Sequence, residues 1–202
     1  MMHTRWLNPA LMRYWAVNAC GKSIVLIGMM GAGKSSVGRC LARRIKLILH
    51  DTDEIVVSKL GLPVPQIFAK HGEDKFREAE TDALRSLAGM ERAIIVTGGG
   101  IVLHEENIDI LKRLGVVVWL DAKRETLFKR ASHSGNRPLL QSQNPRKAFA
   151  QILQARWPLY AKMAHLRVDT SVLTDEEVAV AILSKIARLN PQPGSPIPAT
   201  AP

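Results

Sequence analysis

Residues 28–35 read Gly-Met-Met-Gly-Ala-Gly-Lys-Ser and fit the phosphate-loop pattern G-x-x-x-x-G-K-[ST] at every fixed position. An apolar run at residues 24–27 precedes them, and residues with helical spacing follow. Backbone N–H groups of such a turn, together with the positive end of the helix behind it, bind phosphate oxygens. Because motif and context agree, the sequence predicts a site for a nucleoside triphosphate and disfavours a glycine turn with a surface lysine.

The two side chains that close this segment have different tasks in phosphoryl transfer. Lys34 is expected to reach the β- and γ-phosphates of ATP, and the Ser35 hydroxyl is expected to bind Mg²⁺. The other residues expected to contact the nucleotide phosphates are Gly31, Ala32, Gly33 and Ser36.

Further candidates come directly after other apolar runs, because ligands bind beyond the carboxyl ends of the strands in an open parallel sheet. One carboxylate of Asp51 and Asp53 is expected to take an acceptor hydroxyl and the other to serve hydrated Mg²⁺, although Asp53 also suits a helix N-cap. Residues 98–100 are three glycines, which indicates a backbone that something approaches closely; a plain turn is the alternative. Asp121 is a rival metal partner, but an N-cap is favoured there.

Arg77 and Arg156 lie far apart in the sequence, each in a segment with helical spacing. A guanidinium group presents a planar fork of donors that fits a carboxylate. Taken singly, each arginine is also explained as a solvated or ion-paired surface residue.

Short runs rich in Ile, Val and Leu alternate with helical stretches, which predicts an α/β fold with a parallel sheet covered on both faces. Strands are expected at 24–27, 47–50, 93–97, 116–120 and 166–168. Helices are expected at 35–45, 53–60, 74–88, 105–114, 124–131, 145–156 and 174–189. Gly61, Gly89 and Gly115 follow helical stretches, as glycines that end helices in the left-handed conformation do.

Composition and charge argue against several classes of protein. No apolar run reaches the roughly 18 residues that span a bilayer, so no membrane partner is expected. Cys20 and Cys40 form neither a metal site nor a disulfide framework, which fits a reducing cytoplasm. The net charge is +10, and residues 123–156 are basic with one acid, Glu125. The aromatic interleaving of a single-strand stacking platform is missing, so a solvated helix face is favoured over nucleic-acid binding.

Several motifs together resemble one enzyme family. The phosphate loop is followed, in order, by segments that begin at Asp51 (DTD), Phe76 (FREAE), Gly98 (GGG), Arg137 (RPLL) and Arg156 (R-x-x-x-Y, ending at Tyr160). Their order and approximate spacing are similar to those of the shikimate kinases, over residues 22–189. The phosphate loop alone is shared by many proteins, whereas this combination is much more specific.

The resemblance implies an ATP-dependent kinase that phosphorylates the 3-hydroxyl of shikimate in the pathway to aromatic amino acids, with ATP, Mg²⁺ and shikimate as its small-molecule partners. It implies a P-loop NTPase fold like that of nucleoside monophosphate kinases, with five parallel strands and a lid at about residues 130–144. Residues 23–189 are then a single kinase domain, and a monomer is expected. Residues 1–22 are an extension, disordered or upstream of the true start, and residues 190–202 a disordered proline-rich tail.

The resemblance also implies roles for single residues. Asp53 and the backbone of Gly99, flanked by Gly98 and Gly100, would hold shikimate hydroxyls, while Arg77 and Arg156 would clamp its carboxylate. Arg137 in the lid would close on the ATP phosphates, and Arg130 would pack against the nucleotide base. The strand at 93–97 ends in glycine rather than in a metal-binding aspartate, which leaves Asp51 to hold Mg²⁺ through water beside Ser35. The expected catalytic set is Lys34, Asp51, Asp53 and Arg137.

Two alternatives share the phosphate loop. Another polyol-acid kinase, such as a gluconate kinase, would also bind one carboxylate and several hydroxyls, but the DTD and RPLL segments point away from it. A nucleotide-binding regulator that performs no transfer would keep Lys34 and Ser35 and could lack the acceptor groups, which are all present here.

Overall fold

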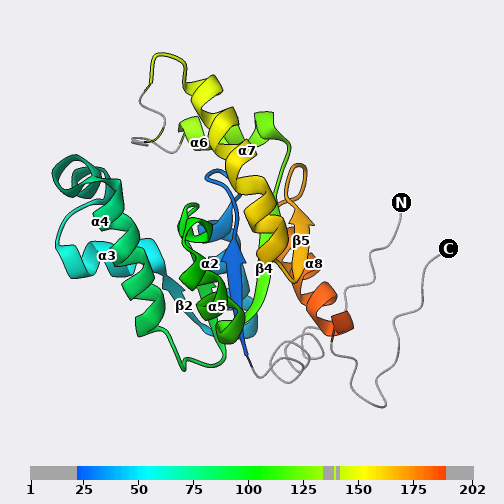
Figure 1. The fold of residues 1–202 in the computed structure, drawn as a ribbon. Helices are drawn as coiled ribbons and strands as arrows, with labels where there is room; N and C mark the ends of the chain where they lie inside the picture. Colours follow the sequence, from blue (N-terminus) through cyan, green and yellow to red (C-terminus); the bar gives the residue numbers. More distant parts are fainter. Residues whose placement is uncertain (1–21, 134–138, 140–141, 190–202) are drawn as a thin grey trace, which may run out of the picture.

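The computed structural model describes residues 22–133, 139 and 142–189, and the two terminal segments lie outside that part of the chain. Five parallel strands form one sheet in the order β2-β3-β1-β4-β5 (Figure 1). The strands are β1 (Ser23–Ile27), β2 (Ile48–Asp51), β3 (Ala93–Val96), β4 (Gly115–Asp121) and β5 (Leu166–Asp169). The predicted parallel α/β fold is therefore confirmed, with each strand within a residue or two of its expected place.

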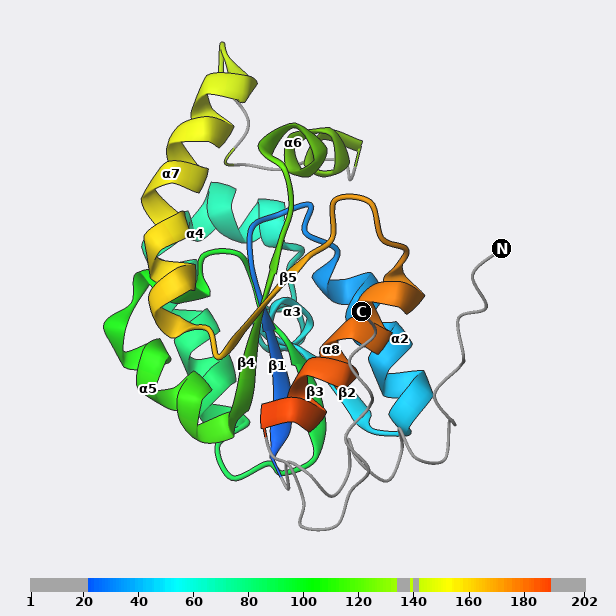
Figure 2. The ribbon, with the colours of Figure 1, turned by 90° about the vertical axis from the view of Figure 1, so that its right-hand side faces the viewer.

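Helices cover both faces of the sheet, as predicted. Figure 2 shows α2 (Lys34–Ile45) and α8 (Asp175–Leu189) on one face, and α5 (Glu105–Leu114) and α7 (Pro145–Met163) on the other. The remaining elements are α3 (Thr52–Leu60), α4 (Val64–Ser86), α6 (Arg124–His133) and the short 3₁₀ helix η1 (Ile101–Leu103). Every residue of β1 and β3 is buried, which explains why these strands are apolar without alternation.

Two helices are longer than their sequence pattern predicted. Helix α4 begins at Val64, shortly after the end of α3 at Leu60. It bends at Gly72, whose φ of 81° and ψ of 173° are not helical. Its N-terminal part was missed because the helical pattern is interrupted at this glycine. Helix α7 continues past Pro158 to Met163, because Tyr160 and Met163 are buried in the core and the packing outweighs the lost backbone hydrogen bond.

The role expected for Gly115 was wrong, whereas that for Gly61 is confirmed. Gly61 ends α3 in the left-handed conformation with φ 68°, and its N–H bonds to the carbonyl of Val57. Gly115 ends α5 with φ 170°, which is extended backbone that any residue adopts. Its lack of a side chain serves close packing instead, since a Cβ there would lie 1.8 Å from the carbonyl oxygen of Ser23 on the neighbouring strand.

None of the helices in the described ranges is long and apolar enough to cross a membrane.

Gly115→Ala is expected to destabilise the fold by about 2–3 kcal/mol, because the added methyl group meets backbone that cannot move without shifting β1. Gly61→Ala is the matched control: it strains a left-handed residue but meets nothing within 4 Å, so about 1 kcal/mol is expected. Urea unfolding of both variants gives the comparison. Equal losses would contradict the close packing of β1 against β4.

Candidate active site

The phosphate loop connects β1 to α2 and lines a cavity of about 350 Å³, here called the phosphate-loop pocket. Lys34 Nζ donates to the carbonyls of Gly28 at 2.8 Å and Met29 at 3.1 Å, so the ammonium group lies over the loop. Ser35 Oγ donates to Asp51 Oδ2 at 3.2 Å. Gly31, Gly33 and Ser36 line the same pocket, whereas Ala32, expected with them, is fully buried and does not line it.

The helix N-cap considered for Asp53 is formed by Asp51, the last residue of β2. Asp51, not Asp53, is the N-cap of α3, because its Oδ1 accepts from the N–H of Asp53 at 3.0 Å. Asp51 therefore holds the start of the helix and the Ser35 hydroxyl with its two oxygens. Asp51 and Asp53 both line the phosphate-loop pocket, together with Thr97, Gly98 and Gly99.

A second cavity, here called the arginine pocket, contains both predicted arginines. It is lined by Met30, Asp53, Val64, Phe68, Phe76, Arg77, Glu80, Gly98, Gly99, Gly100, Leu139 and Arg156. Arg77 comes from α4 and Arg156 from α7, and each is only 5 % exposed, which excludes a surface role for both. The two pockets share Met30, Asp53, Gly98 and Gly99, so they meet at these residues, among which Asp53 has the only carboxylate.

Arg77 is held by two carboxylates of its own helix. Its Nε and Nη2 donate to Glu73 Oε1 at 3.1 and 2.7 Å, and its Nη1 donates to Glu80 Oε2. Burial lowers the pKa of Arg156, and the positive charge of Arg77 lowers it further, although the Tyr160 phenol opposes the shift. Two cationic groups thus lie close together in a largely dry space, an arrangement that favours an anion between them.

The glycine segment after β3 is close-packed against charged side chains. A Cβ on Gly98 would lie 2.1 Å from Glu80 Oε1, and one on Gly100 would lie 2.1 Å from Arg77 Nη1. The N–H of Gly98 donates to Thr52 Oγ1 at 3.2 Å. The close approach predicted for residues 98–100 is therefore present, and it occurs within a turn in which the N–H of Ile101 donates to the carbonyl of Gly98.

Glu80 is a site residue that the sequence reasoning missed. Its carboxylate is 1 % exposed, and its Oε1 makes no hydrogen bond with any described residue. Burial raises the pKa of Glu80 to about 7, with the charge of Arg77 opposing the shift and that of Asp53 adding to it. The spacing Arg77-x-x-Glu80 was an available signal, since residues three apart on a helix lie side by side.

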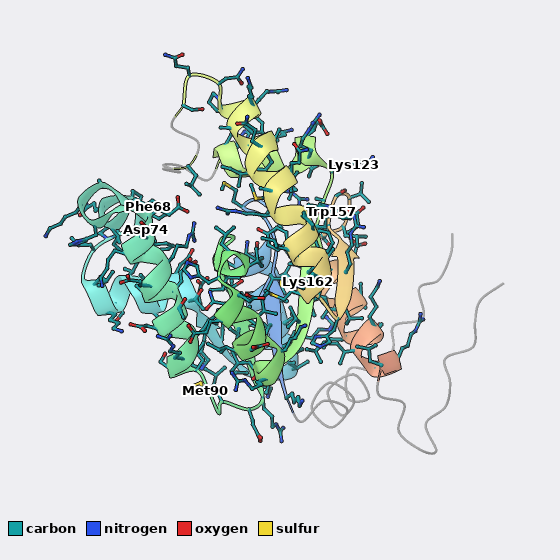
Figure 3. All side chains as sticks on the ribbon, viewed as in Figure 1. Phe68, Asp74, Met90, Lys123, Trp157 and Lys162 are labelled. Carbon is teal, nitrogen blue, oxygen red and sulfur yellow. The ribbon has the colours of Figure 1, made fainter. Side chains whose placement is uncertain are left out.

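The apolar wall of the arginine pocket was missed as well. Phe68 lies on the N-terminal part of α4 (Figure 3), and its ring is 4.8 Å from that of Phe76. The Arg77 guanidinium lies over both rings. Val64 and Leu139 complete the wall. Apolar residues at helical spacing are usually core, so the sequence carried no signal that these face a ligand site.

The basic residues of the stretch 123–156 lie partly at the site and partly on the surface. Arg130 lines the phosphate-loop pocket and donates to Thr170 Oγ1 and O at 3.1 and 2.9 Å. Arg137 and the other predicted lid residues at 134–138, 140 and 141 lie outside the described residues. Lys123 is exposed at the start of α6 (Figure 3). A larger open hollow of about 740 Å³ between α6 and α7 has exposed cations at its rim and shares no lining residue with either pocket. These cations fit the solvated helix face that the sequence favoured.

The N-cap predicted for Asp121 was wrong. Asp121 is the last residue of β4, and its buried carboxylate pairs with Arg167 of β5 at 2.6 Å. The backbone of Lys123, not Asp121, accepts the first helical hydrogen bond of α6, from Leu127.

Comparison with known proteins gives one consistent family. The family model described as shikimate kinase matches residues 30–187. The shikimate kinase of Thermodesulfovibrio yellowstonii is 42% identical over 169 residues, which cover 84% of this chain and 97% of that protein. That of Moorella thermoacetica is 45% identical over 164 residues, with 81% and 91% covered.

Solved structures agree with these relatives. The shikimate kinase from Acinetobacter baumannii, solved in complex with shikimate, is 36% identical and superposes with a TM-score of 0.81, covering 85% of this chain and 96% of that one. A gluconokinase from Sinorhizobium meliloti reaches a TM-score of 0.55 at 22% identity over 84% of this chain and 94% of its own, a likeness of fold alone.

The raised pKa of Glu80 predicts how the stability of the fold depends on pH. Because the folded-state pKa is about 7 and the ordinary value is 4.5, the folded protein binds the extra proton between these values. This group therefore lowers the free energy of unfolding as pH rises from about 4.5 to 7, by about 1–3 kcal/mol, and the loss persists above pH 7.

Glu80→Gln removes that titration. The free energy of unfolding of the unsubstituted protein should therefore fall from pH 5 to pH 8 by more than that of the variant. Urea unfolding at both pH values measures the change, and comparing two pH values cancels those losses of packing that do not depend on pH. Glu78→Gln, on the exposed side of the same helix, controls for removing a carboxylate. Parallel stability profiles of Glu80→Gln and the unsubstituted protein would contradict the buried titration.

Proposed function

This chain belongs to the shikimate kinase family, and from that premise we propose which of its residues carry the reaction. The activity is the ATP-dependent phosphorylation of shikimate, which yields shikimate 3-phosphate and ADP. The acceptor is a small organic acid with one carboxylate and three hydroxyls, so the site must supply cations for the first and hydrogen-bond partners for the others.

One observation carries the assignment of roles: the phosphate-loop pocket and the arginine pocket meet at Asp53. ATP in the first would place its terminal phosphate toward the shared residues, and shikimate in the second would place a hydroxyl against the same point. Phosphoryl transfer requires mainly positioning and charge neutralisation, with a carboxylate near the attacking oxygen. Asp53 is the carboxylate at that junction, and it would orient the 3-hydroxyl and accept its proton.

Arg77 and Arg156 form the proposed carboxylate clamp. They approach from α4 and α7, so a carboxylate between them is held from two sides. Glu73, which pairs with the Arg77 guanidinium, is partly exposed to solvent, so the substrate carboxylate would take its place. Glu80 is fully buried and stays behind Arg77 to hold the guanidinium in position.

The remaining lining suits the shikimate ring. Phe68, Phe76 and Val64 offer apolar contact to ring carbons, while the backbone of Gly99, between Gly98 and Gly100, offers polar groups at close range. Glycines allow this backbone to come close to both the substrate and the charged side chains. The pocket thus combines an anion site at one end with an apolar wall along its side.

Mg²⁺ is proposed to bind beside the phosphate loop. The hydroxyl of Ser35 and the carboxylate of Asp51 are 3.2 Å apart, and such oxygen donors are the ligands that Mg²⁺ takes. Among the described residues, no group of three His, Cys, Asp or Glu could hold a metal by itself. This fits an ion that is held by one or two protein oxygens, by water and by the phosphates, where it neutralises the charge of the phosphoryl group.

The nucleotide roles follow from the same pocket. Lys34, which now donates to loop carbonyls, would turn its charge to the β- and γ-phosphates, and the N–H groups of residues 31–36 would surround them. Arg130 would support the base, fixed by its bonds to Thr170. Arg137 is proposed to close on the phosphates from the lid. A cytoplasmic location and a monomeric state also remain predictions.

Neither alternative function is favoured. The gluconokinase resemblance extends to the fold only, and the family match covers the segments that distinguish shikimate kinases. A regulator without transfer would not need two buried arginines and an aspartate beside the phosphate loop.

Arg156→Ala is expected to weaken shikimate binding by about 2–5 kcal/mol, or about 30-fold or more in KM, because it removes half of the clamp from a buried site. The KM for ATP should stay the same. Steady-state assays with either substrate varied measure both constants. Arg146→Ala, an exposed arginine of the same helix, is the control. Unchanged KM for shikimate in both Arg77→Ala and Arg156→Ala would exclude the clamp.

Asp53→Asn is expected to lower kcat at least about 100-fold, because the acceptor hydroxyl loses its base. The fold should be retained, since Asp51 and not Asp53 caps α3. ADP formation with and without shikimate, together with Tm, is the measurement, and Glu54→Gln at the exposed neighbouring position is the control. A normal kcat would remove Asp53 from the chemistry.

A further inference from the structure

Tyr160 joins three separate segments beneath the arginine pocket. Its side chain comes from α7, is fully buried, and stacks on Trp119 of β4 with ring centroids 5.9 Å apart. Its hydroxyl donates to the carbonyl of Gly99 at 2.5 Å. A buried aromatic ring by itself is ordinary core, but a buried hydroxyl costs free energy unless it is hydrogen-bonded, so its partner is the informative part.

The same hydroxyl also contacts Arg156, one helical turn earlier. The Arg156 guanidinium interacts with the phenol, whose oxygen opposes the cost of burying the charge, while the phenol hydroxyl donates to the Gly99 carbonyl. The phenol therefore links the arginine to the glycine segment, because its oxygen faces the cation while its proton is held by the carbonyl. An arginine side chain has many rotamers, and this contact reduces them before any substrate arrives.

The contact with Gly99 also sets the direction of the glycine segment. A trans peptide is planar and holds its C=O and the following N–H in opposite directions. With the Gly99 carbonyl turned to Tyr160, the N–H of Gly100 points away from it. Arg77 packs on the Cα of Gly100, so the peptide is enclosed between Tyr160 and Arg77.

We propose that Tyr160 is a positioning residue for the acceptor side of the reaction: its hydroxyl holds Arg156 and the Gly99–Gly100 peptide in the geometry that binds shikimate. It touches no reacting atom and lines neither the phosphate-loop pocket nor the arginine pocket. The inference rests on the proposed roles of Arg156 and Gly99. It assigns to the tyrosine of the R-x-x-x-Y segment a function that ring packing alone would not require.

Tyr160→Phe tests the proposal, because it removes the hydroxyl and keeps the ring on Trp119. The KM for shikimate is expected to rise about three- to tenfold, with the KM for ATP unchanged. The Kd for shikimate in the absence of ATP, measured by calorimetry, should rise by the same factor. Trp119→Phe is the packing control: it removes part of the stacked ring and leaves the Tyr160 hydroxyl and its bond to Gly99, so Tm should fall while KM for shikimate stays constant.

A double-mutant cycle with Arg156→Lys tests the path through the arginine. Lysine keeps the positive charge but lacks the planar set of guanidinium donors that the phenol positions. Tyr160→Phe should therefore have a smaller effect on the KM for shikimate in that background. Equal rises of both KM values, or no change in either, would overturn the proposal, as would fully additive effects in the cycle. If the unsubstituted protein shows no shikimate-dependent ADP formation, the proposed function fails. If the unsubstituted protein forms ADP in a shikimate-dependent way and Tyr160→Phe has the same KM for shikimate, only the role of Tyr160 fails.

Discussion

The burial of two guanidinium groups in one small pocket is the constraint that the surrounding residues satisfy. Arg77 and Arg156 are each almost fully removed from solvent, and like charges at close range in a dry site are unfavourable. Glu80 and Glu73 compensate Arg77 from its own helix, while Tyr160 contacts Arg156. In the proposed function, the carboxylate of the acceptor replaces Glu73 at Arg77 and gives Arg156 an anionic partner.

Several features that look unrelated follow from this constraint. Gly98 and Gly100 leave room for the carboxylate of Glu80 and the guanidinium of Arg77, which a Cβ at either position would meet. Helix α4 bends at Gly72, so that its N-terminal part can add Val64 and Phe68 to the pocket whose charged end is formed by the part after the bend. Helix α7 continues beyond Pro158 because Tyr160 and Met163 are anchored in the core.

The sheet order places the two pockets in contact. Strand β1, which leads into the phosphate loop, lies between β3 and β4, and β2 lies beside β3. The segments after β1, β2 and β3 therefore converge at one edge, which is where a parallel sheet binds ligands. Asp53 comes from the second of these segments and the glycines from the third, and both reach the phosphate loop from the same side.

Local pattern alone determined the strands, the phosphate loop and the edge at which ligands bind, because apolar runs, a glycine-rich motif and the parallel topology are short-range or general properties. The resemblance in motifs added the family and the two arginines. Only the tertiary structure decided that Asp51 rather than Asp53 caps α3, that Glu80, Phe68 and Phe76 face the site, and that Gly115 is required by the backbone of Ser23. These depend on which atoms of distant segments come within a few ångströms when helices and strands pack, and spacing along one chain carries no record of those distances.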